Sequence, residues 1–252
     1  MKNENKKKLN SEFSSLHGSK EACSDNLEHY RNIASQYAEI ENAIAILSDL
    51  NTNRSYMYFG KFAKELNIEH SDTSSQIDSI WEDQILILLH PDDLKKKYLH
   101  ELRFFHHFTK LPKKIRFDHY LISKIRMQNH FRNYIPVVHR MFYIADTNNN
   151  TLRFALCLYN PMVIDFSGKC YIVNSKNGQK VDLDSNSDTN ILTKREKEIL
   201  NLIDKGMMSK SISESLCISI NTVNRHRQEI LKKLQVKNSI EACRIAKDLH
   251  LM

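Results

Sequence analysis

Amide, guanidinium and ammonium side chains recur at helical spacing over residues 221–232. An arginine can donate two parallel hydrogen bonds to guanine, and asparagine or glutamine can bond adenine in the same bidentate way. On a helical wheel the candidates for such base contacts gather on one side, and they are Asn221, Asn224, Arg225 and Gln228. These residue types at this spacing therefore indicate hydrogen bonding to base edges in a DNA groove.

A second set of side chains borders this face at positions that suit backbone phosphates. The candidates are Thr222, His226, Arg227, Lys232 and Lys233. Residues 190–252 hold 12 Lys and Arg against 7 Asp and Glu, a net charge of +5 within the +7 of the whole chain. A further +3 lies in residues 1–9, so the segment between is close to neutral. A basic end segment joined to a neutral body is typical of a phosphate-binding module attached to a unit with another role.

Two short helices are predicted just before the polar one. Thr193 and Glu196 form a capping box, in which each side chain bonds the other residue's backbone amide, so a helix begins there. Gly206 supplies a left-handed end to that helix. A second helix follows over residues 209–216, with apolar residues four apart. The close spacing of these signals favours a compact helical domain.

The polar helix itself is predicted over residues 220–234, with Ser219 as its N-cap. Its other side is apolar and consists of Val223, Ile230, Leu231 and Leu234. Only the turn at residues 217–219 separates it from the preceding helix, and a fourth helix is expected over residues 239–249. A polar helix face by itself is most often solvated surface, but the helix-turn-helix spacing and the local positive charge together favour nucleic-acid binding.

This segment resembles the LuxR-type, or NarL-type, helix-turn-helix of bacterial transcription regulators. The similarity rests on residues 192–200 (LTKREKEIL), Gly206, residues 219–227 (SINTVNRHR) and residues 233–234 (KL). It implies an all-α tetrahelical domain at residues 191–252, whose third helix enters the major groove and which binds inverted repeats as a dimer. In that family the positions of Asn224, Arg225 and Gln228 commonly face the bases.

The sequence departs from the family pattern at two positions. Ser213 replaces a small alanine at the crossing of the two central helices, and Asn224 replaces a frequent lysine. Serine is small enough to be tolerated at a close helix crossing. A neutral amide at a base-facing position changes what can be recognised there, so no operator sequence carries over from the family.

The body upstream is predicted to be α+β. We expect strands at residues 54–59, 118–127, 134–145 and 152–159, helices at 80–88 and from His90-Pro91 to before Pro112, and a hairpin at 169–173 and 179–183. A short strand, small helices and a three-strand meander are the order of a PAS domain. Trp81 and His90-Pro91-Asp92-Asp93 add to that resemblance, which covers residues 51–159. It implies a PAS-like sensory or dimerisation domain at residues 51–183.

Three further segments complete the predicted domain organisation. Residues 1–26 form a polar basic tail, and residues 184–190, rich in Ser and Asn, form the linker. Residues 27–50 are predicted as a leading helix, because their apolar residues follow a heptad pattern. Those residues are Tyr30, Ile33, Tyr37, Ile40, Ile44 and Leu47. The helix either packs on the sensory sheet or pairs with its copy in a second subunit.

The sequence contains no sign of an enzyme, a cofactor or a metal site. There is no Gly-rich phosphate loop or nucleophile elbow, and we expect no catalytic residues. His100, His106, His107 and His119 lie close in sequence but lack metal-ligand spacing, so we interpret them as surface or packing residues. The five cysteines are scattered and, without a signal peptide or long apolar run, are expected to be reduced in a cytoplasmic protein with no membrane partner.

The sequence thus predicts a sequence-specific, dimeric transcription regulator that acts on double-stranded DNA together with RNA polymerase. A small molecule or protein would signal through the PAS-like domain. A phosphorylation-type receiver would begin with a short buried strand followed by paired carboxylates, whereas this chain begins polar and helical. Two alternatives stay open: a sigma-factor-like protein associated with RNA polymerase, and an interaction scaffold with a residual DNA-binding domain.

Overall fold

The computed structural model consists of two compact units, divided near residue 185. The structure describes residues 24–68, 74–80, 82–146, 150–164, 169–184, 191–234, 236, 238–249 and 251–252. The sheet unit comprises the described residues up to 184, and the C-terminal unit comprises those from 191 onward. The predicted tail before residue 24, most of the predicted linker, Cys23 and Trp81 lie outside the described residues.

One antiparallel sheet of eight strands forms the centre of the sheet unit, in the order β3-β2-β1-β6-β5-β4-β7-β8. The strands are β1 (Ile44–Asp49), β2 (Arg54–Phe59), β3 (Ser74–Ile77), β4 (His119–Gln128), β5 (Tyr134–Ala145), β6 (Leu152–Pro161), β7 (Tyr171–Asn174) and β8 (Lys180–Asp182). Neighbouring strands in the middle are joined by long ladders: the one between β4 and β5 is regular, and the one between β5 and β6 has a register shift between Ile144 and Ala145. The strands predicted at residues 54–59 and 134–145 have the expected bounds, and the other predicted strands lie within two residues of the observed ends.

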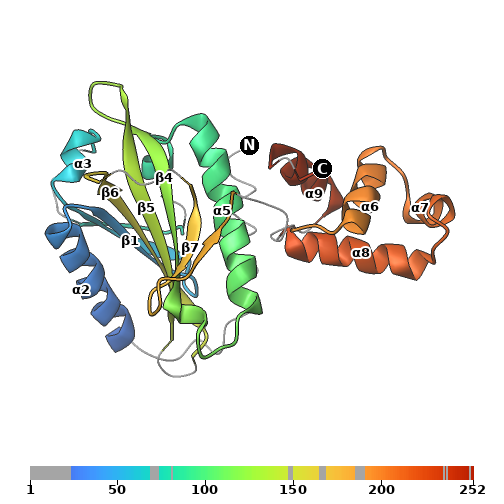
Figure 1. Cartoon of the computed structure of the whole chain (residues 1–252), viewed down its shortest axis with the longest axis horizontal. Coiled ribbons are helices and arrows are strands. Elements are labelled where there is room, and N and C mark those ends of the chain that lie inside the picture. Colours follow the sequence, from blue (N-terminus) through green and yellow to red (C-terminus); the bar gives the residue numbers. More distant parts are fainter. Residues whose placement is uncertain are drawn as a thin grey trace. The chain divides into compact units, whose positions relative to one another are not determined.

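Helices cover both faces of this sheet (Figure 1). They are α2 (Ser24–Ile40), α3 (Phe62–Glu65), α4 (Asp83–Leu86) and α5 (Pro91–Lys110), with a short 3-10 turn at Arg116–Asp118. Ala34 and Ala38 of α2 pack with Phe154 and Leu156 of β6 on one face. On the other face Phe104 of α5 stacks on Tyr143 of β5, with ring centroids 4.9 Å apart. Consequently β1 and β6 are buried along nearly their whole length on both sides.

The prediction of a single leading helix over residues 27–50 is wrong beyond residue 40. Helix α2 ends at Ile40, and Ile44 and Leu47, which were assigned to its heptad pattern, are fully buried in strand β1. Asn42 adopts a left-handed conformation with φ of 50°, and the amide of Ala43 donates to the carbonyl of Ala38. These are the features of a helix C-terminus closed by a left-handed residue. The apolar spacing fitted a helix because a strand buried on both faces has no alternation to distinguish it.

Other differences from the predicted organisation are small. Strand β3 and helix α3 were not predicted, since β3 is a polar, four-residue edge strand and α3 is a single turn. The tail predicted for residues 1–26 is too long, because Ser24 already begins α2. Asp184, assigned to the linker, instead belongs to the sheet unit: its carboxylate accepts a hydrogen bond from the Cys170 amide and pairs with His100 Nε2 at 2.8 Å.

Helix α5 begins where the proline signal predicted. Pro91 lies in its first turn, and His90 Nδ1 accepts a hydrogen bond from the Asp92 amide. The Asp93 carboxylate is bound by the Arg126 guanidinium of β4 at 2.8 and 2.9 Å and by the Arg126 amide at 2.8 Å. Burial alone would raise the pKa of Asp93, but these bonds outweigh burial and lower it. Asp93 therefore fixes the start of α5 to the sheet, which accounts for it without a catalytic role.

The C-terminal unit is helical throughout its described residues, as expected for residues 191–252. Its helices are α6 (Lys194–Asp204), α7 (Ser209–Ser215), α8 (Ile220–Lys233) and α9 (Ser239–Asp248). Helix α6 contacts α7, α8 and α9, so it is central to this unit. In the described part of the chain, no helix combines the length and apolar character needed to cross a membrane.

Gly60 lets the end of β2 pass against the end of α2, and we expect Gly60→Ala to destabilise the sheet unit. An added Cβ would lie 2.3 Å from the Ala38 carbonyl oxygen and 2.8 Å from the Ala43 amide nitrogen. Overpacking against backbone should lower the free energy of unfolding by about 1–3 kcal/mol. The measurement is urea denaturation of the full-length chain, followed by the fluorescence of its single tryptophan, Trp81.

Gly178→Ala is the control for this prediction. Gly178 has φ of 72°, but none of the described atoms beyond its chain neighbours lies within 4 Å of the place a methyl group would take, so only the backbone conformation opposes the change. We expect a cost of about 1 kcal/mol. A Gly178→Ala variant at least as unstable as Gly60→Ala would contradict the role of the close contact at Gly60.

Candidate nucleic-acid interface

The capping box predicted at the start of α6 is present. The Glu196 amide donates to the Thr193 hydroxyl at 3.2 Å, and the Thr193 amide donates to Glu196 Oε2 at 2.7 Å. Gly206, with φ of 81°, follows the helix end. The capping box therefore begins α6 and Gly206 follows its end, as the sequence predicts, which leaves a helix of 11 residues.

The link between α7 and α8 is short and hydrogen-bonded. Cys217 occupies the left-handed region with φ of 51°, and the Ile218 amide donates to the Ser213 carbonyl at 3.0 Å, which closes α7. Ser219 then caps α8 by accepting from the Thr222 amide at 3.0 Å. Ser213 is buried, and its hydroxyl donates to the Lys210 carbonyl at 2.6 Å. The serine at the helix crossing is thus satisfied within its own helix.

Helix α8 separates its side chains into two faces as the helical wheel predicted. Val223, Ile230 and Leu234 are almost completely buried against the rest of the unit. The four base-facing candidates lie on the other side, and they are Asn221, Asn224, Arg225 and Gln228. All four are exposed. Packing of the apolar face therefore presents the four side chains together on the outer side of α8.

The five phosphate candidates fall into two groups. Lys232 is exposed on α8 and His226 is half-buried, while the exposed Thr222 has its hydroxyl 2.9 Å from the Ser219 hydroxyl at the start of the helix. The other two are engaged inside the unit. Arg227 donates to the hydroxyls of Ser209 in α7 and Ser239 in α9, each at 3.0 Å, and Lys233 binds Glu196. Arg227 and Lys233 thus have structural contacts that the sequence pattern did not indicate.

The ion pair between Lys233 and Glu196 joins α8 to the first turn of α6. Lys233 Nζ lies 2.7 and 2.8 Å from the two carboxylate oxygens, and the Glu196 side chain is only 5% exposed. Burial alone would raise the pKa of Glu196, but the bonds from Lys233 and Thr193 outweigh burial and lower it. One carboxylate therefore both caps α6 and sets the position of the C-terminal end of α8.

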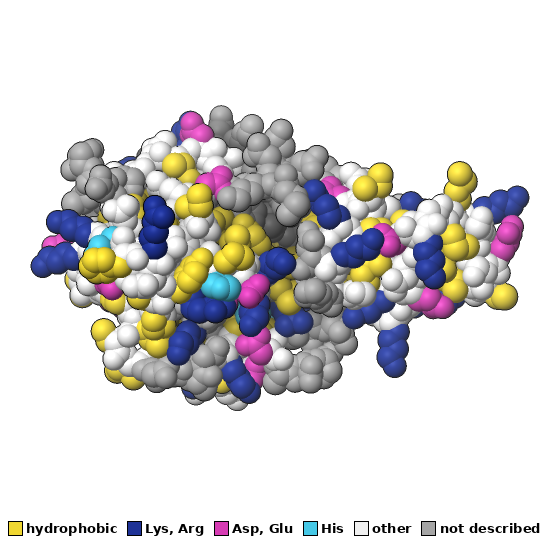
Figure 2. All heavy atoms as spheres, turned by 90° about the horizontal axis from the view of Figure 1, so that it is seen from above, with side chains coloured by type: hydrophobic (Ala, Val, Ile, Leu, Met, Phe, Trp, Pro, Cys, Tyr) yellow, Lys and Arg dark blue, Asp and Glu magenta, His cyan; other side chains and the backbone are white. Residues whose placement is uncertain are grey.

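Basic side chains are spread over this unit. Figure 2 shows Lys and Arg side chains on the visible face of the unit, at the right of the view, with a smaller number of acidic side chains between them. This distribution agrees with the local excess of 12 basic over 7 acidic residues from residue 190 onward. The polar face of α8 thus belongs to a unit with a positive field, which attracts phosphates.

The sequence of this unit matches a protein family. Residues 190–246 match the family model described as bacterial regulatory proteins, luxR family. The C-terminal unit is a LuxR-type helix-turn-helix domain. The capping box, Gly206 and the short turn before α8 are the local features that build this LuxR-type domain from the sequence.

Curated relatives share this domain and little else of the chain. The oxygen regulatory protein NreC of Staphylococcus haemolyticus is 44% identical over 69 residues, which are 27% of this chain and 31% of that protein. The transcriptional regulatory protein DesR of Bacillus subtilis is 45% identical over 62 residues, which are 25% and 31% of the two chains. The chain therefore spans about a third of the length of these relatives.

Two solved structures align over most of the chain, at low similarity. The Vibrio cholerae VqmA dimer, described as a LuxR-type receptor that binds DNA, is 12% identical, with coverage of 92% and 89% and a TM-score of 0.28. Escherichia coli SdiA is 14% identical, with coverage of 98% and 97% and a TM-score of 0.25. Both TM-scores are too low to indicate a common arrangement of the whole chain.

The histidines of the sheet unit take the packing and surface positions that their spacing favoured. His100 is buried and pairs with Asp184, and the rings of His107 and His119 are in edge contact with centroids 5.9 Å apart. His106 lies on α5 beside Phe105. None of the four belongs to a cluster of metal-ligand type among the described residues.

Glu196→Gln tests the ion pair that joins α6 to α8. Glutamine can still accept the capping hydrogen bond, but it loses the charge that faces Lys233. Because the pKa of Glu196 is lowered on folding, its stabilisation is present above its ordinary pKa of 4.5 and is lost as the pH falls through the folded value. At pH 7 we expect the opening free energy of α6 and α8 amides to fall by about 1–3 kcal/mol, as measured by hydrogen exchange of the full-length chain.

Glu198→Gln is the matched control on the same helix. Glu198 pairs with Arg195 at 2.7 Å, but its side chain is 50% exposed, so its loss should cost less than about 0.5 kcal/mol. Wild type and Glu196→Gln should also converge in stability as the pH falls well below 4.5. Equal effects of the two substitutions at pH 7 would refute the special role of Glu196.

Proposed function

We propose that this protein is a dimeric, sequence-specific transcription regulator that binds double-stranded DNA through α8 and acts on RNA polymerase. The observation that carries the proposal is the outer face of α8, where Asn221, Asn224, Arg225 and Gln228 project together from a LuxR-type domain. Amide and guanidinium groups at this spacing suit bidentate bonds to bases in the major groove. Lys232 and the first-turn Thr222 suit contacts to the flanking phosphates.

We further propose that the sheet unit is PAS-like and controls DNA binding. Support comes from strand order: β2-β1-β6-β5-β4 forms the central part of the sheet, and the helices α3, α4 and α5 lie in sequence between β2 and β4. From β2 through β6 this is the order expected of a PAS domain, namely a short strand, small helices and a three-strand meander; β1 and the outer strands β3, β7 and β8 are additional to it. A cleft of about 530 Å³ between α5 and β4 offers room for a signal molecule, and its lining includes Lys96, Lys124 and Asp184.

The working mechanism is a population shift between dimer geometries. A signal that binds one geometry better moves the population toward it, by at most its difference in affinity for the two. In the favoured geometry, two copies of α8 would reach half-sites about one DNA turn apart. The neutral sheet unit would thus act on DNA only through the positions of the two basic domains.

Arg225→Ala tests the assignment of the base-contacting helix. Loss of a bidentate contact to guanine should weaken binding to a duplex selected from a random pool by about 1–3 kcal/mol, roughly 5- to 150-fold in Kd. Discrimination among bases at one position of each half-site should relax as well. Binding is measured by fluorescence anisotropy at physiological salt. Lys205→Ala, which removes an exposed positive charge at the end of α6, is the control of equal charge change.

Equal affinities of wild type and Arg225→Ala for the selected duplex would show that α8 does not contact bases as proposed. A loss of the same size in Lys205→Ala would show that Arg225 acts only through its charge.

Lys232→Ala tests the phosphate assignment through salt dependence. Each neutralised phosphate contributes about −0.9 to the slope of log K against log salt concentration, because bound counterions are released. We expect Lys232→Ala to weaken binding to selected and unrelated duplexes alike. The magnitude of the slope should fall by about 1. Wild-type binding that does not change with salt would instead support the alternative of a scaffold with a residual DNA-binding domain.

A further inference from the structure

The face of the sheet under α5 contains a row of polar side chains that neither the fold nor DNA binding explains. Strand register places Ser123 of β4 opposite His139 of β5, and His139 opposite Tyr159 of β6. All three residues are almost completely buried. Cys157 lies two residues before Tyr159 and therefore shares its face of the sheet. Glu101 of α5 lies over this row, so side chains that are distant in sequence meet in the interior.

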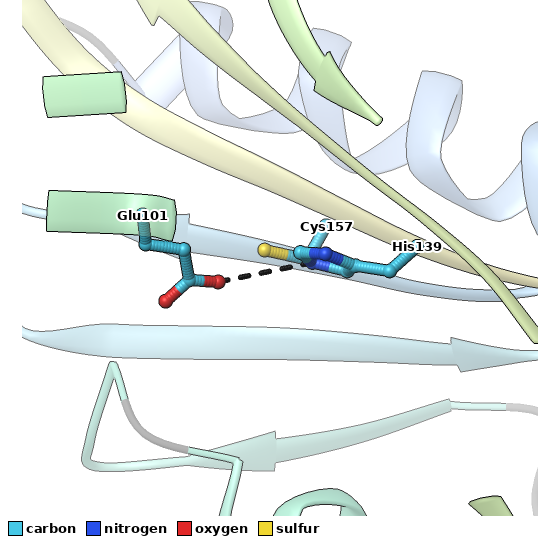
Figure 3. Close-up of side chains that lie close together, drawn as sticks. All are labelled: Glu101, His139 and Cys157. Atoms are coloured by element: carbon cyan, nitrogen blue, oxygen red, sulfur yellow. Dashed lines mark ion pairs between the residues drawn. The ribbon is translucent and has the colours of Figure 1, made fainter. Parts of the chain in front are cut away.

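Three of these side chains carry atoms that ligate metal ions. One ligand atom each from Glu101, His139 and Cys157 lie within 4.8 Å of one another. Figure 3 shows the three side chains converging from α5, β5 and β6, with the ion pair between Glu101 and His139 as a dashed line. Among the described residues this is the one group of three such side chains at that spacing.

His139 supplies the observation that points to a missing partner. Its ring is fully buried, and among the described residues Nε2 has no hydrogen-bond partner, since the nearest carboxylate oxygen of Glu101 is 3.8 Å away. A buried polar atom without a partner costs about 1–3 kcal/mol, so it calls for an explanation. His139 Nδ1 lies 3.4 Å from the Ser123 hydroxyl, and in the tautomer in which Nδ1 donates to that hydroxyl, Nε2 carries a lone pair directed at the cluster.

The balance of charges around the cluster is also compatible with a bound cation. Glu101 and the buried Glu82 provide two carboxylates, and Lys97 Nζ lies 2.7 Å from Glu101 Oε1 and 3.6 Å from Glu82 Oε1. One ammonium thus faces two acids in a largely buried site. Tyr159 donates to Glu82 at 2.8 Å, which holds that carboxylate beside the cluster. Buried charge is costly unless it is balanced, and a divalent ion would balance the second acid together with a thiolate.

We propose that Glu101, His139 and Cys157 bind one divalent transition-metal ion of the zinc type. A carboxylate, an imidazole and a thiolate are the three ligand types that Zn²⁺ takes in proteins, and three protein ligands leave a fourth position for another molecule. Ligand atoms stand roughly 3–4 Å apart around zinc, so small rotations of the Glu101 and Cys157 side chains close the site. Binding displaces the thiol proton: Zn²⁺ forms a bond to the Cys157 sulfur, and one H⁺ leaves.

The surroundings fit this role. Ser123 orients the imidazole, and Lys97 fixes one carboxylate oxygen of Glu101, which are the kinds of neighbouring bonds that position metal ligands. Lys97 and Ser123 also line the cleft of about 530 Å³ beside α5, so that cleft lies next to the cluster. The proposed site is independent of DNA binding by α8.

The test is titration of the full-length, metal-free chain with CoCl₂. We expect one equivalent to bind and to give the near-ultraviolet charge-transfer band of a cobalt–thiolate bond, which ZnCl₂ then removes by displacement. Cys157→Ala should abolish the band, and His139→Gln should weaken binding by about tenfold or more. The controls are Cys170→Ala, a buried thiol of the same unit, and Cys217→Ser, an exposed thiol. Both should keep the band.

Absence of the band in wild type, or its loss in Cys170→Ala or Cys217→Ser but not in Cys157→Ala, would overturn the proposal. Because Cys157→Ala could unfold the sheet unit, X-ray absorption of the zinc-loaded Cys217→Ser chain gives a second measurement. It should show one sulfur at about 2.3 Å with nitrogen or oxygen at about 2.0–2.1 Å. A shell of nitrogen and oxygen alone would refute the site.

Discussion

The sheet unit depends on apolar cover for both faces of its two central strands. Every residue of β1 and eight of the ten residues of β6 are buried, so each face needs a helix against it. Helix α2 covers one face through its small residues Ala34 and Ala38, and α5 covers the other through Phe104. The requirement explains why α2 must end before Asn42, where the chain turns back to form β1, and why Gly60 has no space for a side chain.

Helix α5, which covers the second face of the sheet, also brings polar side chains together beneath it. Helix α5 brings Lys97 and Glu101 over a row in which β4, β5 and β6 contribute Ser123, His139 and Tyr159. A buried polar cluster is less stable than an apolar one unless its members satisfy each other, and within the described residues His139 Nε2 is left unsatisfied. A metal ion would supply the missing partner, and the cluster would then be a place where the sheet unit can sense its surroundings through α5.

The C-terminal unit obeys a different constraint, the junction of α6 with α8. Glu196 satisfies an amide of the helix start and the ammonium of Lys233 at once, while Arg227 links α8 to α7 and α9. These contacts occupy Arg227 and Lys233, two cations of α8 for which the sequence pattern predicts contacts to phosphates. What stays on the outside is the amide and guanidinium face, so the same packing that holds α8 also sets which of its polar side chains stay exposed.

The sequence by itself determined the local structure of this protein wherever short-range chemistry decides. The capping box at Thr193, the N-cap Ser219, the helix start at Pro91, the turn at Gly178 and the two faces of α8 all depend on residues close to each other in sequence. Only the tertiary structure decided the rest. Ile44 and Leu47 fit a helix or a doubly buried strand equally well, and neighbouring strands made the choice. The partners of Arg227 and Lys233, and the meeting of Glu101, His139 and Cys157, arise from contacts between distant segments, for which no local spacing carries a signal.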